Sequence, residues 1–84
     1  MTSFQDVETL AVGTDIEPGQ YTTDGAPGGF LQSNCYYEIH KSDAGTFTDL
    51  VKNGNIGENS KGRVTLRKGQ YFSSNGGCTW TKAG

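Results

Sequence analysis

Long apolar stretches are absent from the sequence, and charged residues are sparse. No run approaches the ~18 apolar residues that a membrane-spanning helix needs, and Asp, Glu, Lys and Arg together make up only 19% of the chain. The formal net charge of -2 argues against general binding to polyanions. Residues 1–10 hold two acids and neither Lys nor Arg, so we expect no secretion signal. Neither a membrane nor a nucleic acid is therefore expected as a partner.

Metal ligands and catalytic constellations are also scarce. One histidine, His40, and two cysteines, Cys35 and Cys78, fall short of the four ligands of a structural zinc site. Cys35 lies five positions before His40, which in a strand places the two side chains on opposite faces. The glycines of residues 57–62 have phosphate-loop spacing, but Arg63 follows where a lysine is required. We expect no metal, no cofactor, no catalytic residues and no enzymatic activity.

Small and turn-forming residues dominate what is present. Gly, Thr, Ser and Asn account for 34 of the 84 residues, a composition typical of strands and tight turns. We predict an all-β fold with Gly-rich loops, a small antiparallel β-sandwich or barrel-like domain, as a single domain over 1–84. Residues 1–8 are expected as a flexible N-terminal arm, and 46–52 as at most one short helical turn. The predicted strands cover residues 9–12, 20–24, 30–41, 63–67, 70–74 and 78–82, the last two forming a hairpin around Asn-Gly-Gly at 75–77.

Alternation within two of these strands predicts which side chains face the core. Inward-facing residues are expected to be Cys35, Tyr37, Ile39, Val64 and Leu66. Outward-facing residues are expected to be Tyr36, Glu38, His40, Arg63, Thr65 and Arg67. On this pattern His40 is interpreted as a solvated strand residue.

Outward aromatic side chains are the candidates for binding. Tyr36 and Phe72 lie on the outward phases of their strands and are expected to contact a sugar ring or a protein, together with the loop 25–32 that contains Phe30.

Basic residues form one cluster, which includes Arg63 and Arg67 and has aromatic residues nearby. It resembles a platform for single-stranded nucleic acid, but the net charge favours a solvated strand face instead. The strands at 63–67 and 70–74 are expected to be sheet edges that pair between copies, so we predict a homo-oligomer.

The two cysteines allow two interpretations. A bridge between Cys35 and Cys78 would close a loop of about 43 residues and contribute roughly 4 kcal/mol to a domain with little apolar surface to bury. Two buried free thiols are the alternative. The absence of a secretion signal fits the second, whereas the small size of the domain fits the first.

Four segments carry a resemblance to a known family: Val-Gly-Thr-Asp-Ile at 12–16, Pro-Gly-Gln-Tyr at 18–21, Cys-Tyr-Tyr at 35–37 and Gly-Cys-Thr-Trp at 77–80. Together they resemble a small, largely uncharacterised β domain of actinobacterial cell-surface proteins and lipoproteins and of actinobacteriophage proteins. The resemblance implies a disulfide between Cys35 and Cys78 and no catalytic residues. Unlike the usual bacterial member, the sequence shows no lipobox or linker, and it has an extra loop at 25–32.

These observations lead to a ranked set of functions, all of them non-enzymatic. The first is a structural or binding module of a bacteriophage virion, either a capsid decoration or a tail component. The alternative is an extracellular recognition domain that binds cell-wall glycan or a surface protein, and a further alternative is a small cytosolic phage effector that binds a host protein. The expected location is accordingly the virion or the extracellular space, with the cytosol as the alternative.

Overall fold

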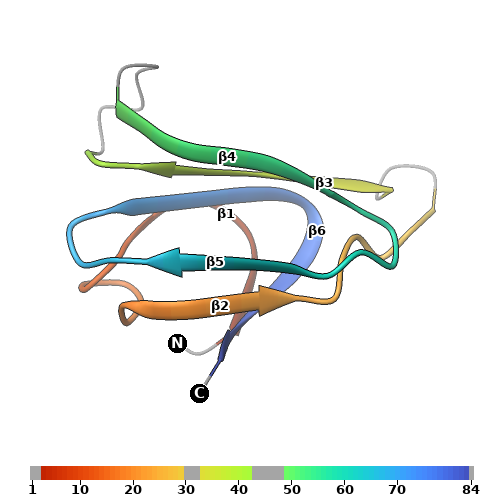
Figure 1. Ribbon diagram of the computed structural model, residues 1–84, viewed down its shortest axis with the longest axis horizontal. Coiled ribbons are helices and arrows are strands. Elements are labelled where there is room, and N and C mark those ends of the chain that lie inside the picture. The colour runs from red at the N-terminus through yellow and green to blue at the C-terminus, as the bar shows by residue number, and fades with distance from the viewer. Residues whose placement is uncertain (1–2, 30–32, 43–48, 84) are drawn as a thin grey trace.

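The computed structural model describes residues 3–29, 33–42 and 49–83, which form strands and loops and contain no α-helix. The strands are β1 (Ser3–Ala11), β2 (Gly19–Thr23), β3 (Asn34–His40), β4 (Leu50–Gly57), β5 (Gly62–Leu66) and β6 (Tyr71–Ala83). All of their pairings are antiparallel. The predicted all-β class is therefore confirmed, as a single sheet that curls over its own core (Figure 1).

Strand β6 is the centre of this sheet. Its first part pairs with β3 and its last part pairs with β2, while β1 runs along its other side over both parts. The strand order is β4-β3-β6-β2-β5. In Figure 1, β4 and β3 lie above, β5 and β2 lie below, and β6 passes from the upper pair to the lower one. We call β4, β3 and the first part of β6 the first half-sheet, and β5, β2 and the last part of β6 the second half-sheet.

A bend in β6 joins the two half-sheets. Gly76 and Gly77 both have a φ of +97°, a conformation that side chains with a Cβ rarely adopt. The bend is held by β1, because Gln5 Nε2 donates to the Gly77 carbonyl at 2.7 Å and the Gly77 N–H donates to Asp6 Oδ1 at 2.9 Å. The hairpin predicted at 75–77 is therefore wrong, since these glycines bend one long strand instead of reversing the chain.

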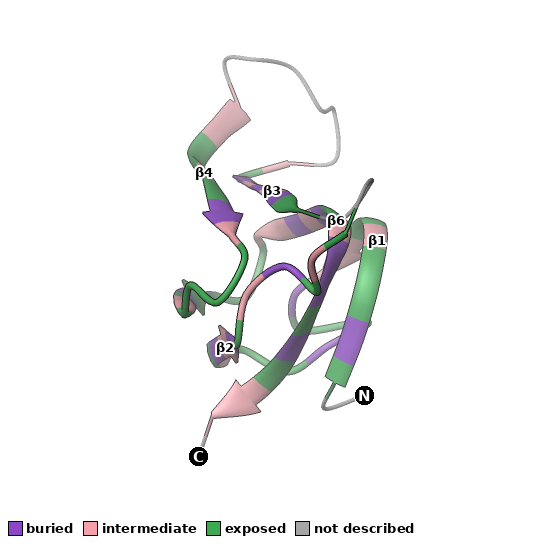
Figure 2. Cartoon of the chain, turned by 90° about the vertical axis from the view of Figure 1, so that its right-hand side faces the viewer, coloured by how far each residue is buried: buried purple, intermediate pink, exposed green. Residues whose placement is uncertain are grey.

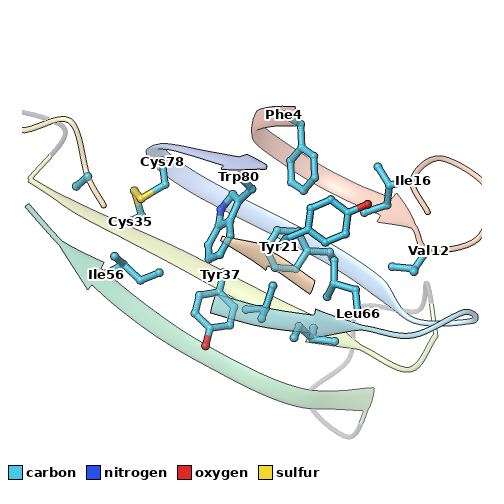
Figure 3. Packing of buried hydrophobic residues seen from close by; sticks show 14 residues of the cluster. Phe4, Val12, Ile16, Tyr21, Cys35, Tyr37, Ile56, Leu66, Cys78 and Trp80 are labelled. Atoms are coloured by element: carbon cyan, nitrogen blue, oxygen red, sulfur yellow. A yellow bond between two sulfur atoms is a disulfide. The ribbon is translucent and has the colours of Figure 1, made fainter. Parts of the chain in front are cut away.

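Aromatic rings fill the space between the half-sheets (Figure 3). Trp80, Tyr21 and Phe72 have no exposed surface, and Trp80 packs edge-on against Phe72 with ring centroids 5.4 Å apart. Such pairs add about 0.5–1.5 kcal/mol beyond the burial of their area. The Trp80 indole N–H donates to the hydroxyl of Ser74 at 3.0 Å, so the buried donor is satisfied.

The disulfide Cys35–Cys78 ties β3 to the last part of β6, with the two Cα atoms 5.9 Å apart. The predicted inward face is also confirmed, because the buried residues include Cys35, Tyr37, Ile39, Val64 and Leu66. Figure 2 shows how buried and exposed residues alternate along the central strand.

Three further expectations differ from the structure. In the segment 46–52, expected as at most one short helical turn, residues 50–52 belong to β4 and only Asp49 has 3₁₀ conformation, whereas 46–48 lie outside the described residues. Residues 3–8, expected as part of an arm, belong to β1. The segment 70–74 is not a sheet edge, because Tyr71 to Ser74 have partners in β1 and β3. Strand β5 does lie at an edge, as predicted, and β4 lies at the opposite one.

Candidate binding groove

The residues expected to bind a ligand do not gather in one place. Tyr36 is half-buried on the outer face of β3. Phe72 is completely buried in the core, so the outward orientation expected of its side chain is wrong. Arg63 and Arg67 are exposed on or just after β5, at the far side of the sheet from β3. Phe30 lies outside the described residues, as do the other residues of 30–32.

A groove exists beside Tyr36 because β1 does not follow β6 evenly. The register slips on both sides of Val7, and Asp6 has a φ of +49°. Bulges of this kind redirect side chains and interrupt a ladder. The slipped stretch forms one wall, β3 forms the other, and the first part of β6 forms the floor. Two adjoining cavities of about 110 and 360 Å³ fill this β1–β3 groove, whose polar lining includes Glu8, Tyr36, Glu38, His40, Tyr71 and Ser73.

A hydrogen-bonded row runs along the wall formed by β3. Tyr36, Glu38 and His40 share one face because they alternate along the strand. The Tyr36 hydroxyl donates to Glu38 Oε2 at 2.6 Å and accepts from Asn53 Nδ2 at 3.1 Å. His40 Nε2 lies 2.9 Å from Glu38 Oε1, which requires Nε2 to carry the proton when the carboxylate is ionised. We call these four residues the polar row.

Hydrogen bonds in the polar row set the charge of its members. The hydrogen bond from His40, followed by the one from Tyr36, lowers the pKa of Glu38 below its ordinary value. The hydrogen bond to Glu38 is the main reason why the pKa of Tyr36 is raised. At neutral pH, Glu38 is therefore a carboxylate and Tyr36 a neutral phenol.

His40 is buried, contrary to the prediction that it is solvated. Only 8% of the residue is exposed, and its Nδ1 has no hydrogen-bond partner within the described part of the chain. In register, His40 lies beside Tyr71 of β6, which in turn lies beside Ala11 of β1. The side chain of His40 points to the outer face of β3, and the neighbouring strands β6 and β1 bury it there.

Elsewhere on the described surface, fewer charged and aromatic groups line a hollow. A hollow of about 400 Å³ lies on the second half-sheet, where Thr22, Thr79, Thr81 and Asp24 are among its lining residues and no aromatic ring lines it. No group of three or more His, Cys, Asp or Glu that could hold a metal ion occurs among residues 3–29, 33–42 and 49–83. Within the same residues, no helix is long and apolar enough to cross a membrane.

Most of the groove has no signal in the local sequence. Alternation did place Tyr36, Glu38 and His40 on one face, but only Tyr36 was selected as a binding residue. Glu8 and Tyr71 gave no signal, because their approach to β3 depends on the slipped register of β1 and on the central place of β6.

The fold and the groove define a small, disulfide-bonded, all-β domain with one polar cleft on its first half-sheet. A family model, that of the Rv1352-like extracellular domain, matches residues 2–81, and the chain belongs to this family. No curated protein and no solved structure matches the chain.

The family bears directly on location. An extracellular domain family and a disulfide both fit an extracellular placement, because disulfides persist in oxidising compartments. The predicted resemblance to a cell-surface β domain is confirmed at this level. The match favours the extracellular alternative over the virion module and the cytosolic effector, and the predicted link to bacteriophages gains no support from it.

Proposed function

We propose that this chain is a non-enzymatic recognition domain that binds cell-wall glycan in the β1–β3 groove. The polar row carries the proposal, because it presents an ionised carboxylate whose orientation is already fixed by two hydrogen bonds. A site whose groups are ordered before binding loses less entropy when the ligand arrives.

The chemistry of the groove suits a sugar. Carboxylates accept hydrogen bonds from hydroxyl groups, and half-buried aromatic rings pack against the apolar faces of sugar rings. On β3, Glu38 supplies a carboxylate and Tyr36 an aromatic ring. On the other strands, Glu8 of β1 supplies a carboxylate and Tyr71 of β6 an aromatic ring. Membership in an extracellular domain family supports the proposal further, because cell-wall glycan is found in the same compartment.

Several observations support binding without catalysis. A general acid needs a raised pKa, whereas the pKa of Glu38 is lowered. Cys35 and Cys78 are joined in a disulfide and offer no thiolate. Ser74 is buried and accepts the indole N–H of Trp80, so its hydroxyl is not presented as a nucleophile.

Sedimentation with purified cell-wall material tests this function. The parent domain is expected to bind, and Tyr36→Ala and Glu38→Gln are each expected to weaken binding about tenfold or more, the usual effect of losing a contact to a charged group. Arg63→Gln on the second half-sheet is the control and should bind like the parent. Equal binding by all four proteins, or no binding by the parent, would overturn the proposal.

A further inference from the structure

Negative charge collects in the β1–β3 groove. Its lining contains the carboxylates of Asp6, Glu8 and Glu38, and neither Lys nor Arg. The chain has seven basic residues in all, so this absence reflects their placement and not their scarcity. Nearby like charges with no opposite charge among them produce a local field that attracts cations.

The three carboxylates are only partly compensated within the described residues. Glu38 accepts a hydrogen bond from His40, and the ion pair between Lys61 and Asp24 lies on the second half-sheet. Asp6 accepts one backbone N–H and Glu8 is exposed. Each oxygen of Glu38 accepts one hydrogen bond, which leaves lone pairs for further donors because a carboxylate has about four acceptor positions.

His40 adds a buried polar group beside the carboxylate of Glu38. With the proton on Nε2, its Nδ1 is a bare acceptor that is buried and has no donor within the described part of the chain. A buried acceptor without a donor is unusual in proteins. His40 itself belongs to the lining of the groove that holds the carboxylates.

Two half-buried tyrosines line the groove, one in each of its two cavities. Tyr36 and Tyr71 line opposite parts of the groove, one on β3 and one on β6. The faces of aromatic rings attract cations, by about 0.5–2 kcal/mol depending on solvent exposure. The groove thus combines acceptors with rings, a combination that suits a protonated amine better than a neutral ligand.

We infer that the ligand of the β1–β3 groove is a glycan that carries free ammonium groups, such as one with glucosamine residues in place of N-acetylated ones. The inference rests on the proposed function and assigns its ligand class. The ammonium group donates to Glu38 and Glu8, while the carbon skeleton of the sugar packs against Tyr36. Acetylation of the amino group removes its positive charge and therefore lowers the affinity of the glycan for the groove.

Paired probes test the charge requirement directly. A glucosamine tetramer and an N-acetylglucosamine tetramer share one skeleton, and calorimetric titration at low and at physiological salt compares them. The glucosamine tetramer is expected to bind about tenfold tighter or more, with the difference shrinking as salt rises. Glu8→Gln and Glu38→Gln should each remove most of that difference. Glu58→Gln, a same-charge change outside the groove lining, should leave it intact.

The outcomes separate this inference from the function beneath it. Equal affinity for the two tetramers overturns the ammonium requirement but leaves glycan binding standing. A lysine-containing peptide is compared in the same titration. If it binds tighter than the glucosamine tetramer and its affinity falls on acetylation, the ligand is not a glycan, and only the preference for a cation is retained. Binding of cell-wall material without binding of either tetramer overturns the inference alone. Unchanged Trp80 fluorescence in every variant confirms that the fold is intact, because Trp80 lies at the centre of the core.

Discussion

Replacing both Cys35 and Cys78 by Ala removes the covalent link between β3 and the end of β6. The two residues are 43 positions apart and almost completely buried. In the chain-entropy treatment, a loop of that length makes the bridge worth about 4 kcal/mol at 25 °C. For a domain of this size such a loss lowers the melting temperature by on the order of 20 °C. Alanine is preferred over serine here, since a serine hydroxyl would be buried without a partner.

Urea unfolding of the parent and of the double variant, each with and without a reducing agent, provides the assay. The parent should lose about 4 kcal/mol on reduction, whereas the variant should not respond. The slope of unfolding free energy against urea should be steeper without the bridge, because the unfolded chain then exposes more surface. A loss below about 1 kcal/mol, well under the loop-closure value, would refute the reasoning that this domain depends on its cross-link.

Three further predictions concern the bend, the core and the groove. Gly76→Ala should cost about 4 kcal/mol or more in urea unfolding, because the new Cβ would clash with the backbone carbonyl oxygen of Asn34. Gly69→Ala has nearly the same φ of +93° but open space, so only about 1–2 kcal/mol is expected, and equal losses would contradict the steric argument. Ser74→Ala should cost about 1–3 kcal/mol by leaving the Trp80 N–H unpaired, and unchanged stability would argue against that bond. Because the pKa of Glu38 is lowered in the folded state, the stability it contributes is complete above its ordinary pKa of 4.5 and is lost as the pH falls through the lowered value. Comparing the parent with Glu38→Gln by chemical denaturation from pH 7 to pH 3 should show this, and a constant difference would refute it.

Local sequence pattern predicted those parts of the fold that depend on local geometry. Alternation identified the buried face of β3, including Tyr37, and of β5, including Leu66, because strand side chains alternate wherever the strand pairs. It failed at Gly76 and Gly77, where Asn-Gly-Gly is typical of a hairpin turn. Their positive φ serves a bend that Gln5 stabilises from 72 positions away, and no local signal reports a contact of that range.

The groove was less predictable than the fold for the same reason. Tyr36 and Glu38 were placed on the correct face, but nothing in the sequence around β3 indicates that β1 forms the opposite wall. Phe72 was assigned outward because β6 was divided into two short strands with the wrong phase. Once β6 is recognised as a single central strand, both the burial of Phe72 and that of His40 follow from their neighbours.

The position of β6 also decides when this polypeptide is able to fold. Strands β1, β2 and β3 all pair directly with β6, which is the last strand of the domain, so the sheet cannot form until nearly all of residues 3–83 have been synthesised. Partners so distant in sequence make folding slow, because the cost of closing the long loop precedes the gain from the contacts. Cys78 belongs to the same strand, so oxidation waits for it as well. The sheet and the cross-link of this domain therefore depend on the same late strand.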